Sequence, residues 1–196
     1  NGSIEKAKRL ILTAKKNGAD LVKLQTYEPR NMTINSSRKD FLVKDGLWKG
    51  YKLWDLYEKA QTPLGWQKEL FNYSKKIGIP CFSTPYDDEG VNLLKKLISK
   101  LYKISSFEMK DSTLVKKICK IGKPVIISTG LANVKEIAEV YKIAKKSGCK
   151  KLILLYCVSS YPAKNTDFNL NNIDILKKKF KCEIGFSDHS TDNSVA

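Results

Sequence analysis

The feature that most restricts the fold of this chain is a helix-to-strand pattern that occurs six times along its 196 residues. Each unit joins an amphipathic stretch, with apolar residues every three or four positions, to a short apolar stretch of strand length. Gly18, Gly78, Gly122 and Gly148 follow four of the amphipathic stretches, and glycine is common where helices end. The predicted helices cover residues 4–16, 64–76, 89–99, 111–121, 134–146 and 170–180, and the predicted strands cover residues 19–25, 79–85, 101–106, 124–129, 151–157 and 182–189.

This alternation indicates a parallel sheet, because strands that are apolar on both faces and joined by helices are buried between layers. A spacing of about 25 residues per unit is typical of a barrel or of a doubly wound sheet. The GxGxxG and GxxxxGK[ST] patterns of nucleotide-binding sheets follow none of the strands. We therefore predict an α/β fold, a (β/α)8 TIM barrel that occupies residues 1–196 as one partial domain, with its first strand and last unit missing from this fragment.

One connection, residues 27–62, is much longer than the others and is rich in aromatic and charged residues. A loop of that length in a compact domain is usually functional or forms a lid. We expect its aromatic residues, together with the tryptophan that follows, to pack within the loop, with a wall around a sugar as the alternative. These residues are Trp48, Tyr51, Trp54, Tyr57 and Trp66.

The net charge of +16, from 36 basic and 20 acidic residues, raises nucleic acid or an anionic surface as a partner. Only three of the basic residues are arginines, the type that reads base edges best, and the lysines are spread over most predicted helices. We therefore expect a solvated lysine-rich surface and no nucleic-acid partner. The apolar runs are too short to span a bilayer, so no membrane partner is expected. Five widely spaced cysteines indicate a reducing, cytoplasmic location.

Polar residues gather where the predicted strands end, which in a barrel is the edge that carries the active site. Lys23 and Lys103 interrupt apolar strands, and an unpaired buried ammonium is costly. Each lysine should therefore be paired, lie in a wet cavity or bind an anion. With the surrounding hydroxyls, they predict a site for a phosphate ester, although any single serine or threonine could simply cap a turn. The strand-end set is Lys23, Gln25, Ser83, Thr84, Lys103, Ser105, Ser106, Glu108, Ser128, Thr129, Ser159, Ser160, Tyr161, Ser187, Asp188 and His189.

His189 and Glu108 are the candidates for metal binding and proton transfer. His189 is the only histidine, and its place at a strand end makes a metal-ligand role and a structural role equally open. One imidazole cannot hold a catalytic divalent ion, so the other ligands would lie elsewhere. Glu108 could act as a general acid or base, with a solvated or ion-paired carboxylate as the alternative.

Six motifs resemble, in order and spacing, those of the sialic acid synthase family of phosphoenolpyruvate-dependent nonulosonic acid synthases. They are KLQTY (23–27), FSTPYD (82–87), YKISSFE (102–108), KPVIISTG (123–130), SSYPA (159–163) and GFSDHS (185–190). The stretch 46–63 is most similar to the pseudaminic acid synthase branch, and Asn1-Gly2-Ser3 resembles the end of the family's NHNGS segment. The LGWQ stretch, residues 64–67, departs from the WEWH often found in the family, which puts a sugar contact there in doubt.

The resemblance implies a metal-dependent condensation of phosphoenolpyruvate with an open-chain 2,4-diacetamido-2,4,6-trideoxy-L-altrose, giving pseudaminic acid and phosphate. It assigns Glu108 and Lys103 to catalysis, Gln25 and Tyr161 to the sugar, and His189 to Mn2+ or Mg2+. The residues that it assigns to phosphoenolpyruvate are Lys23, Thr84, Lys103, Ser106, Ser128 and Ser187.

The resemblance also implies a homodimer, with a first-strand glutamate, a second metal histidine and a C-terminal antifreeze-like domain that lie outside this fragment. The fragment alone should then be inactive. Three alternatives stay open: an N-acetylneuraminate or legionaminate synthase that uses N-acetylmannosamine or a related sugar, a Schiff-base aldolase with Lys103 as nucleophile, and a non-enzymatic polyanion-binding protein.

Overall fold

A computed structural model describes residues 2–192, 194 and 195. The chain divides into two compact units, Asn1–Ser99 and Lys100–Ala196, and each is taken by itself below. No helix among these residues has both the length and the apolar character needed to cross a membrane.

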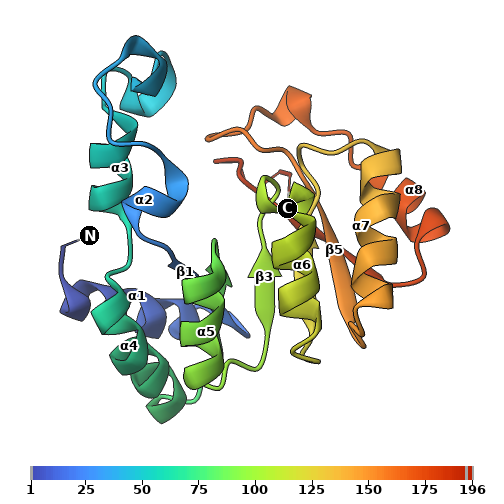
Figure 1. The fold of residues 1–196 in the computed structure, drawn as a ribbon, viewed down its shortest axis with the longest axis horizontal. Helices are drawn as coiled ribbons and strands as arrows, with labels where there is room; N and C mark the ends of the chain where they lie inside the picture. Colours follow the sequence, from blue (N-terminus) through green and yellow to red (C-terminus); the bar gives the residue numbers. More distant parts are fainter. Residues whose placement is uncertain (1, 193, 196) are drawn as a thin grey trace. The chain divides into compact units, whose positions relative to one another are not determined.

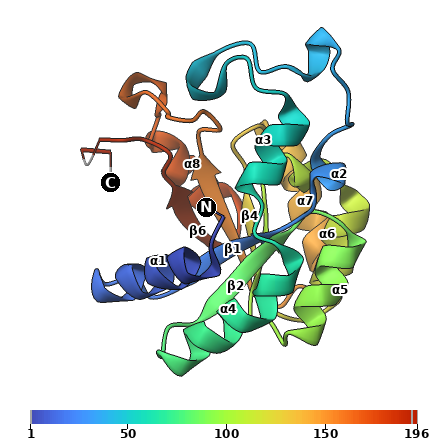
Figure 2. The same cartoon turned by 90° about the vertical axis from the view of Figure 1, so that its left-hand side faces the viewer.

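The described residues of the first unit form two parallel strands and five α-helices, one of them a single turn (Figures 1 and 2). Its strands run in register from Val22 opposite Cys81 to Thr26 opposite Pro85. Its elements are α1 (Ile4–Lys16), β1 (Val22–Thr26), the short α2 (Pro29–Met32), the 3-10 turns Lys39–Phe41 and Gly46–Trp48, α3 (Leu53–Ala60), α4 (Leu64–Lys76), β2 (Cys81–Pro85) and α5 (Asp88–Lys96).

The second unit is a parallel sheet in the order β3-β4-β5-β6, with α6 and α7 packed side by side (Figure 1). Because each strand pairs with the next strand along the chain, every connection crosses over through a helix. Its elements are β3 (Tyr102–Ile104), a 3-10 turn (Glu108–Lys110), α6 (Ser112–Cys119), β4 (Val125–Ser128), α7 (Val134–Lys146), β5 (Leu152–Cys157), a 3-10 turn (Asn165–Asp167), α8 (Asn171–Lys179) and β6 (Glu183–Ser187).

The two faces of β1 have different surroundings. Val22 and Leu24 pack against the core cluster of Ile11, Leu70 and Ile79, to which α1 and α4 contribute. Side chains alternate along a strand, so Lys23 and Gln25 lie on the opposite face, away from these helices. The helix layer therefore determines which strand residues are available to a site.

The boundaries of the helices follow local capping chemistry. Side-chain oxygens of Ser3, Asp87, Asp111 and Asn133 accept hydrogen bonds from backbone N–H groups in the first turns of α1, α5, α6 and α7. At the other end, the four glycines predicted to follow helices all have φ between +75° and +85°, a region that favours glycine. The predicted helices 4–16, 64–76 and 134–146 match the structure at both ends; side-chain caps and glycines explain both ends of the first and third, and Gly78 explains the end of the second.

Two expectations about elements need correction. The connection 27–62 is not a plain loop, since residues 53–60 form α3 and Pro29–Met32 a single helical turn. The third strand was predicted over residues 101–106 but covers only Tyr102–Ile104, because the chain turns at Ser105 and Ser106 toward the 3-10 turn that carries Glu108.

Candidate active site

In the first unit, Lys23, Gln25 and Thr84 share one face of the strand pair. Gln25 lies opposite Thr84 in the parallel register, and Lys23 lies two residues before Gln25 on the same face. Thr84 is 1% exposed, and its Oγ1 has no hydrogen-bond partner in the described part of the chain. A buried hydroxyl without a partner is uncommon and indicates a place where a ligand or water binds.

Lys23 differs from the expectation of a buried ammonium, because its side chain is exposed to solvent. Protein atoms crowd around it nevertheless, and this desolvation lowers the pKa of its ammonium group. An anion bound nearby would reverse that effect, because an opposite charge favours the protonated form. Lys23 is therefore suited to a wet, anion-binding surface.

Gln25 is fixed through both its backbone and its side chain. Its Nε2 donates to the hydroxyl of Tyr86 at 2.7 Å, and its carbonyl oxygen accepts from Gln67 Nε2 at 2.9 Å. Gln67 belongs to the LGWQ stretch and is fully buried, and its Oε1 has no partner among the described residues. This glutamine therefore supports the backbone of β1.

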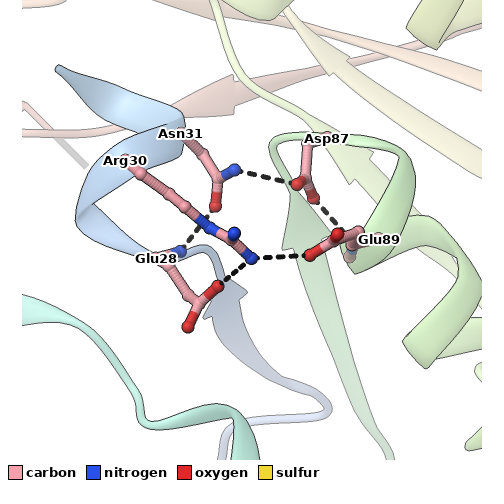
Figure 3. Close-up of polar contacts among 6 residues, drawn as sticks. Glu28, Arg30, Asn31, Asp87 and Glu89 are labelled. Carbon is pink, nitrogen blue, oxygen red and sulfur yellow. Dashed lines mark hydrogen bonds and ion pairs between the residues drawn. The ribbon is translucent and has the colours of Figure 1, made fainter. Parts of the chain in front are cut away.

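The start of the long connection is tied to α5 by a polar network (Figure 3). Arg30 Nη2 lies 2.6 Å from Glu28 Oε2 and 2.8 Å from Glu89 Oε2. Asn31 Nδ2 donates to Asp87 Oδ2 at 2.9 Å, and Asp87 also caps α5. These contacts hold α2 beside the strand ends.

In the second unit, Lys103 and Ser128 come together on one face of the sheet. Lys103 pairs with Ile126 in the register, and Ser128 lies two residues further along β4 on the same face. Lys103 Nζ donates to Ser128 Oγ at 2.7 Å, and Ser128 is 2% exposed. The half-buried Lys103 thus has an internal hydroxyl partner, one of the arrangements expected for a lysine in an apolar strand.

Glu108 begins the 3-10 turn after β3, and its Oε2 is buried without a hydrogen-bond partner in the resolved part of this unit. Burial raises the pKa of the Glu108 carboxyl, while its own backbone N–H and the charge of Lys103 act in the opposite direction. A carboxyl with a raised pKa retains its proton to higher pH, as a general acid requires. The neighbouring Ser105 Oγ is likewise buried without a partner among the described residues.

Cys157, at the end of β5, contacts several predicted site residues. Its Sγ lies 3.8 Å from Ser106 Oγ, 3.6 Å from Ser159 Oγ and 3.9 Å from His189 Nδ1. From the sequence, the cysteines indicated only a reducing location, and the family resemblance assigned no role to this one. Its position two residues before SSYPA was the available indication.

Gly130 brings the ends of β4 and β5 close together. Its backbone N–H donates to Ser106 Oγ at 3.1 Å. A Cβ at this position would lie 2.5 Å from Ser159 Oγ and 2.8 Å from the carbonyl oxygen of Cys157. Only glycine fits without displacing these atoms.

His189 is held in one tautomer by the backbone. Its Nδ1 lies 2.8 Å from the carbonyl oxygen of Val158, so Nδ1 carries the proton and donates. Nε2 is then the nitrogen with a free lone pair for a metal, and Ser187 Oγ lies 3.5 Å from it. Tyr161, which is 55% exposed, places its ring 4.3 Å from the imidazole between centroids.

As a metal site, the described residues are incomplete. They contain no cluster of three or more histidine, cysteine, aspartate or glutamate side chains that could hold an ion. His189 alone fits, since a backbone carbonyl on Nδ1 is a common support for a ligating imidazole. Cys157 lies nearer the Nδ1 side and does not add a second ligand next to Nε2.

Residues 10–196 match the model of the NeuB family. This chain belongs to the NeuB family. Over 96% of its length it is 45% identical to the pseudaminic acid synthase of Campylobacter jejuni, and it covers 55% of that protein. Over 97% of its length it is 37% identical to the N,N'-diacetyllegionaminic acid synthase of the same species, and it covers 58% of that protein. The chain thus spans about half the length of the curated relatives that it matches.

Solved structures agree with the family assignment. The N-acetylneuraminic acid synthetase of Leptospira borgpetersenii, in complex with citrate, matches 99% of this chain and 63% of its own, with a TM-score of 0.86 and 31% identity. A phospho-2-dehydro-3-deoxyheptonate aldolase from Thermotoga maritima, at 16% identity and a TM-score of 0.67, shares the fold. The predicted fold class, an α/β chain of the TIM-barrel type with six helix-to-strand units, is confirmed.

Proposed function

We propose that the complete protein containing this chain condenses phosphoenolpyruvate with 2,4-diacetamido-2,4,6-trideoxy-L-altrose to form pseudaminic acid and phosphate. The observation that carries the proposal is the set of strand-end polar atoms, Thr84 Oγ1, Ser105 Oγ and Glu108 Oε2, that are buried without partners among the described residues. The 45% identity to a pseudaminic acid synthase supports the same reaction class.

Phosphoenolpyruvate carries a phosphate and a carboxylate, and strand ends in each unit carry ammonium groups and hydroxyl donors suited to both. Lys23 and Lys103 would supply the positive charge, and Thr84, Ser106, Ser128 and Ser187 would supply directed hydrogen bonds. Desolvation lowers the pKa of the Lys23 ammonium group, and a bound anion would favour its charged form again.

The reaction forms a bond from C3 of phosphoenolpyruvate to the aldehyde carbon of the open-chain sugar. Water adds at C2, and the tetrahedral intermediate then releases phosphate. Glu108 would exchange the proton of that water, a role that fits a carboxyl whose pKa is raised by burial. Lys103 would stabilise negative charge close to the reacting carbons.

His189 would hold one position of a divalent ion, Mn2+ or Mg2+, through Nε2. Such an ion polarises a carbonyl oxygen when bound. The backbone carbonyl of Val158 would keep Nδ1 protonated and the ring oriented. The remaining ligands would come from outside the described residues.

Gln25 and Tyr161 would bind the sugar. The legionaminic acid synthase relative, at 37% identity, makes a different diacetamido sugar acid the first alternative product, and N-acetylneuraminate the next. We also propose a cytoplasmic homodimer in which a C-terminal antifreeze-like domain follows the barrel, with small-molecule substrates and without a nucleic-acid or membrane partner.

The test measures phosphate release from phosphoenolpyruvate by the complete enzyme with Mn2+. We expect release with the diacetamido altrose, none with N-acetylmannosamine, and none after EDTA treatment. Release with N-acetylmannosamine alone would contradict the proposed substrate, and no release with any amino sugar would contradict the proposed reaction. Inactivation by borohydride only in the presence of substrate would favour the Schiff-base alternative through Lys103.

A further inference from the structure

The hydroxyl of Tyr86, directly after β2, is the partner of the Gln25 side chain. Gln25 Nε2 donates to this oxygen at 2.7 Å, and the two residues are 61 positions apart in sequence. The neighbouring backbone carbonyl of Gln25 is held by Gln67. The side-chain amide of Gln25 is therefore held by the residue after β2, and its backbone is held by α4.

This contact determines which hydrogen-bonding groups of Gln25 remain for a ligand. A glutamine amide has two N–H hydrogens on Nε2 and two lone pairs on Oε1. Tyr86 uses one N–H, which leaves the other N–H and Oε1 available on a group that can no longer rotate freely. Such a fixed amide suits a ligand group that both accepts and donates, such as a hydroxyl or an acetamido group.

Tyr86 is itself held by aromatic packing. Its ring meets that of Tyr27 edge to face, with centroids 5.4 Å apart and planes at 76°. Tyr27 is 3% exposed and contacts Tyr57 of α3 in the same manner, at 6.1 Å and 86°. Burial raises the pKa of Tyr27 to about 12, so its hydroxyl stays protonated and donates to the Tyr57 carbonyl oxygen at 3.3 Å. Three tyrosines thus connect the helix of the long connection to Gln25.

We propose that Tyr86 is a positioning residue for the sugar substrate, which it serves by fixing the orientation of the Gln25 amide. The inference rests on the proposed function, in which Gln25 binds the sugar. It predicts that Tyr86 affects binding of the sugar and leaves binding of phosphoenolpyruvate unchanged, because its hydroxyl contacts Gln25, the residue proposed to bind the sugar.

The experiment compares steady-state kinetics of Tyr86→Phe, Gln25→Ala and the double variant in the complete enzyme. Tyr86→Phe keeps the ring that packs on Tyr27 and removes the hydroxyl that accepts from Gln25. We expect a rise of roughly three- to tenfold in KM for the sugar, the scale of one hydrogen bond, with KM for phosphoenolpyruvate unchanged. In the Gln25→Ala background, Tyr86→Phe should have no additional effect.

The matched control is Tyr73→Phe, which makes the same chemical change in α4, where the ring packs against the Ile11, Leu70 and Ile79 cluster. It should leave both KM values unchanged. Should Tyr86→Phe fail to fold by circular dichroism, Tyr86→Met removes the same acceptor and should raise the sugar KM alike.

The inference is overturned if Tyr86→Phe leaves the sugar KM unchanged, if it raises both KM values equally, or if its effect persists in full without Gln25. Failure of the wild-type enzyme to release phosphate with any amino sugar would instead overturn the proposed function. The two failures are therefore distinguishable.

Discussion

Adding one methyl group at Gly130 should destabilise the second unit measurably. In Gly130→Ala, the new Cβ would lie 2.5 Å from Ser159 Oγ, 2.8 Å from the Cys157 carbonyl oxygen and 2.9 Å from Cys157 Sγ. The serine hydroxyl can rotate away, but the carbonyl belongs to the end of β5 and can move only with the strand. Overpacking of this kind costs about 1–3 kcal/mol, and for a domain of this size about 2 kcal/mol corresponds to a fall of roughly 4–8 °C in Tm.

The assay is thermal unfolding of the complete enzyme, followed by circular dichroism, together with the KM for phosphoenolpyruvate. The KM should rise as well, because Gly130 donates to Ser106, a proposed ligand of that substrate. Gly65→Ala is the control: it lies in α4 with no atom within 4 Å of its added Cβ, and replacing a helical glycine by alanine should stabilise by about 0.5–1 kcal/mol. Equal Tm values for Gly130→Ala and wild type would refute the steric argument.

Three further predictions concern charge and metal. Burial raises the pKa of Glu108 above its ordinary 4.5, so the folded state binds this proton more tightly than the unfolded state. Stability should therefore fall as pH rises from about 4.5 through the folded-state pKa. Glu108→Gln should lessen that fall in urea titrations across pH and should lower kcat by about 100-fold or more. Asp87→Ala should cost about 1 kcal/mol in urea unfolding through loss of the α5 cap. Arg30→Ala should cost less, because its ion pairs are exposed and screened by salt; an equal loss in both variants would contradict this ranking. His189→Ala should weaken Mn2+ binding measured by calorimetry at least about tenfold, and unchanged binding would remove His189 from the proposed metal site.

Local chemistry made most of the fold predictable. Amphipathic stretches that end in glycine, and begin at residues such as Asn133, define helices without help from distant parts of the chain. Strand lengths were predicted less well, since the length of β3 depends on where its neighbour stops pairing. The eight residues of α3 were missed because a helix that short depends on contacts such as that between Tyr57 and Tyr27.

The candidate site was predicted in part, for a similar reason. Strand-end polarity identified Lys103 and Ser128, and the structure places them 2.7 Å apart. The partners of site residues could not be derived in this way: Tyr86 meets Gln25 across 61 positions, and Val158 meets His189 across 31. Such pairings depend on strand register and turn geometry, which periodicity does not reveal.

The alternation of side chains along β1 makes this strand more sensitive to the insertion of one residue than to the substitution of one. Val22 and Leu24 face the core, and Lys23 and Gln25 face the other way. Because side chains alternate, shifting the strand by one residue would turn the ammonium and the amide toward α1 and α4 and expose the two apolar side chains. Natural variants of this segment should therefore differ by replacement and hardly ever by a single added or deleted residue.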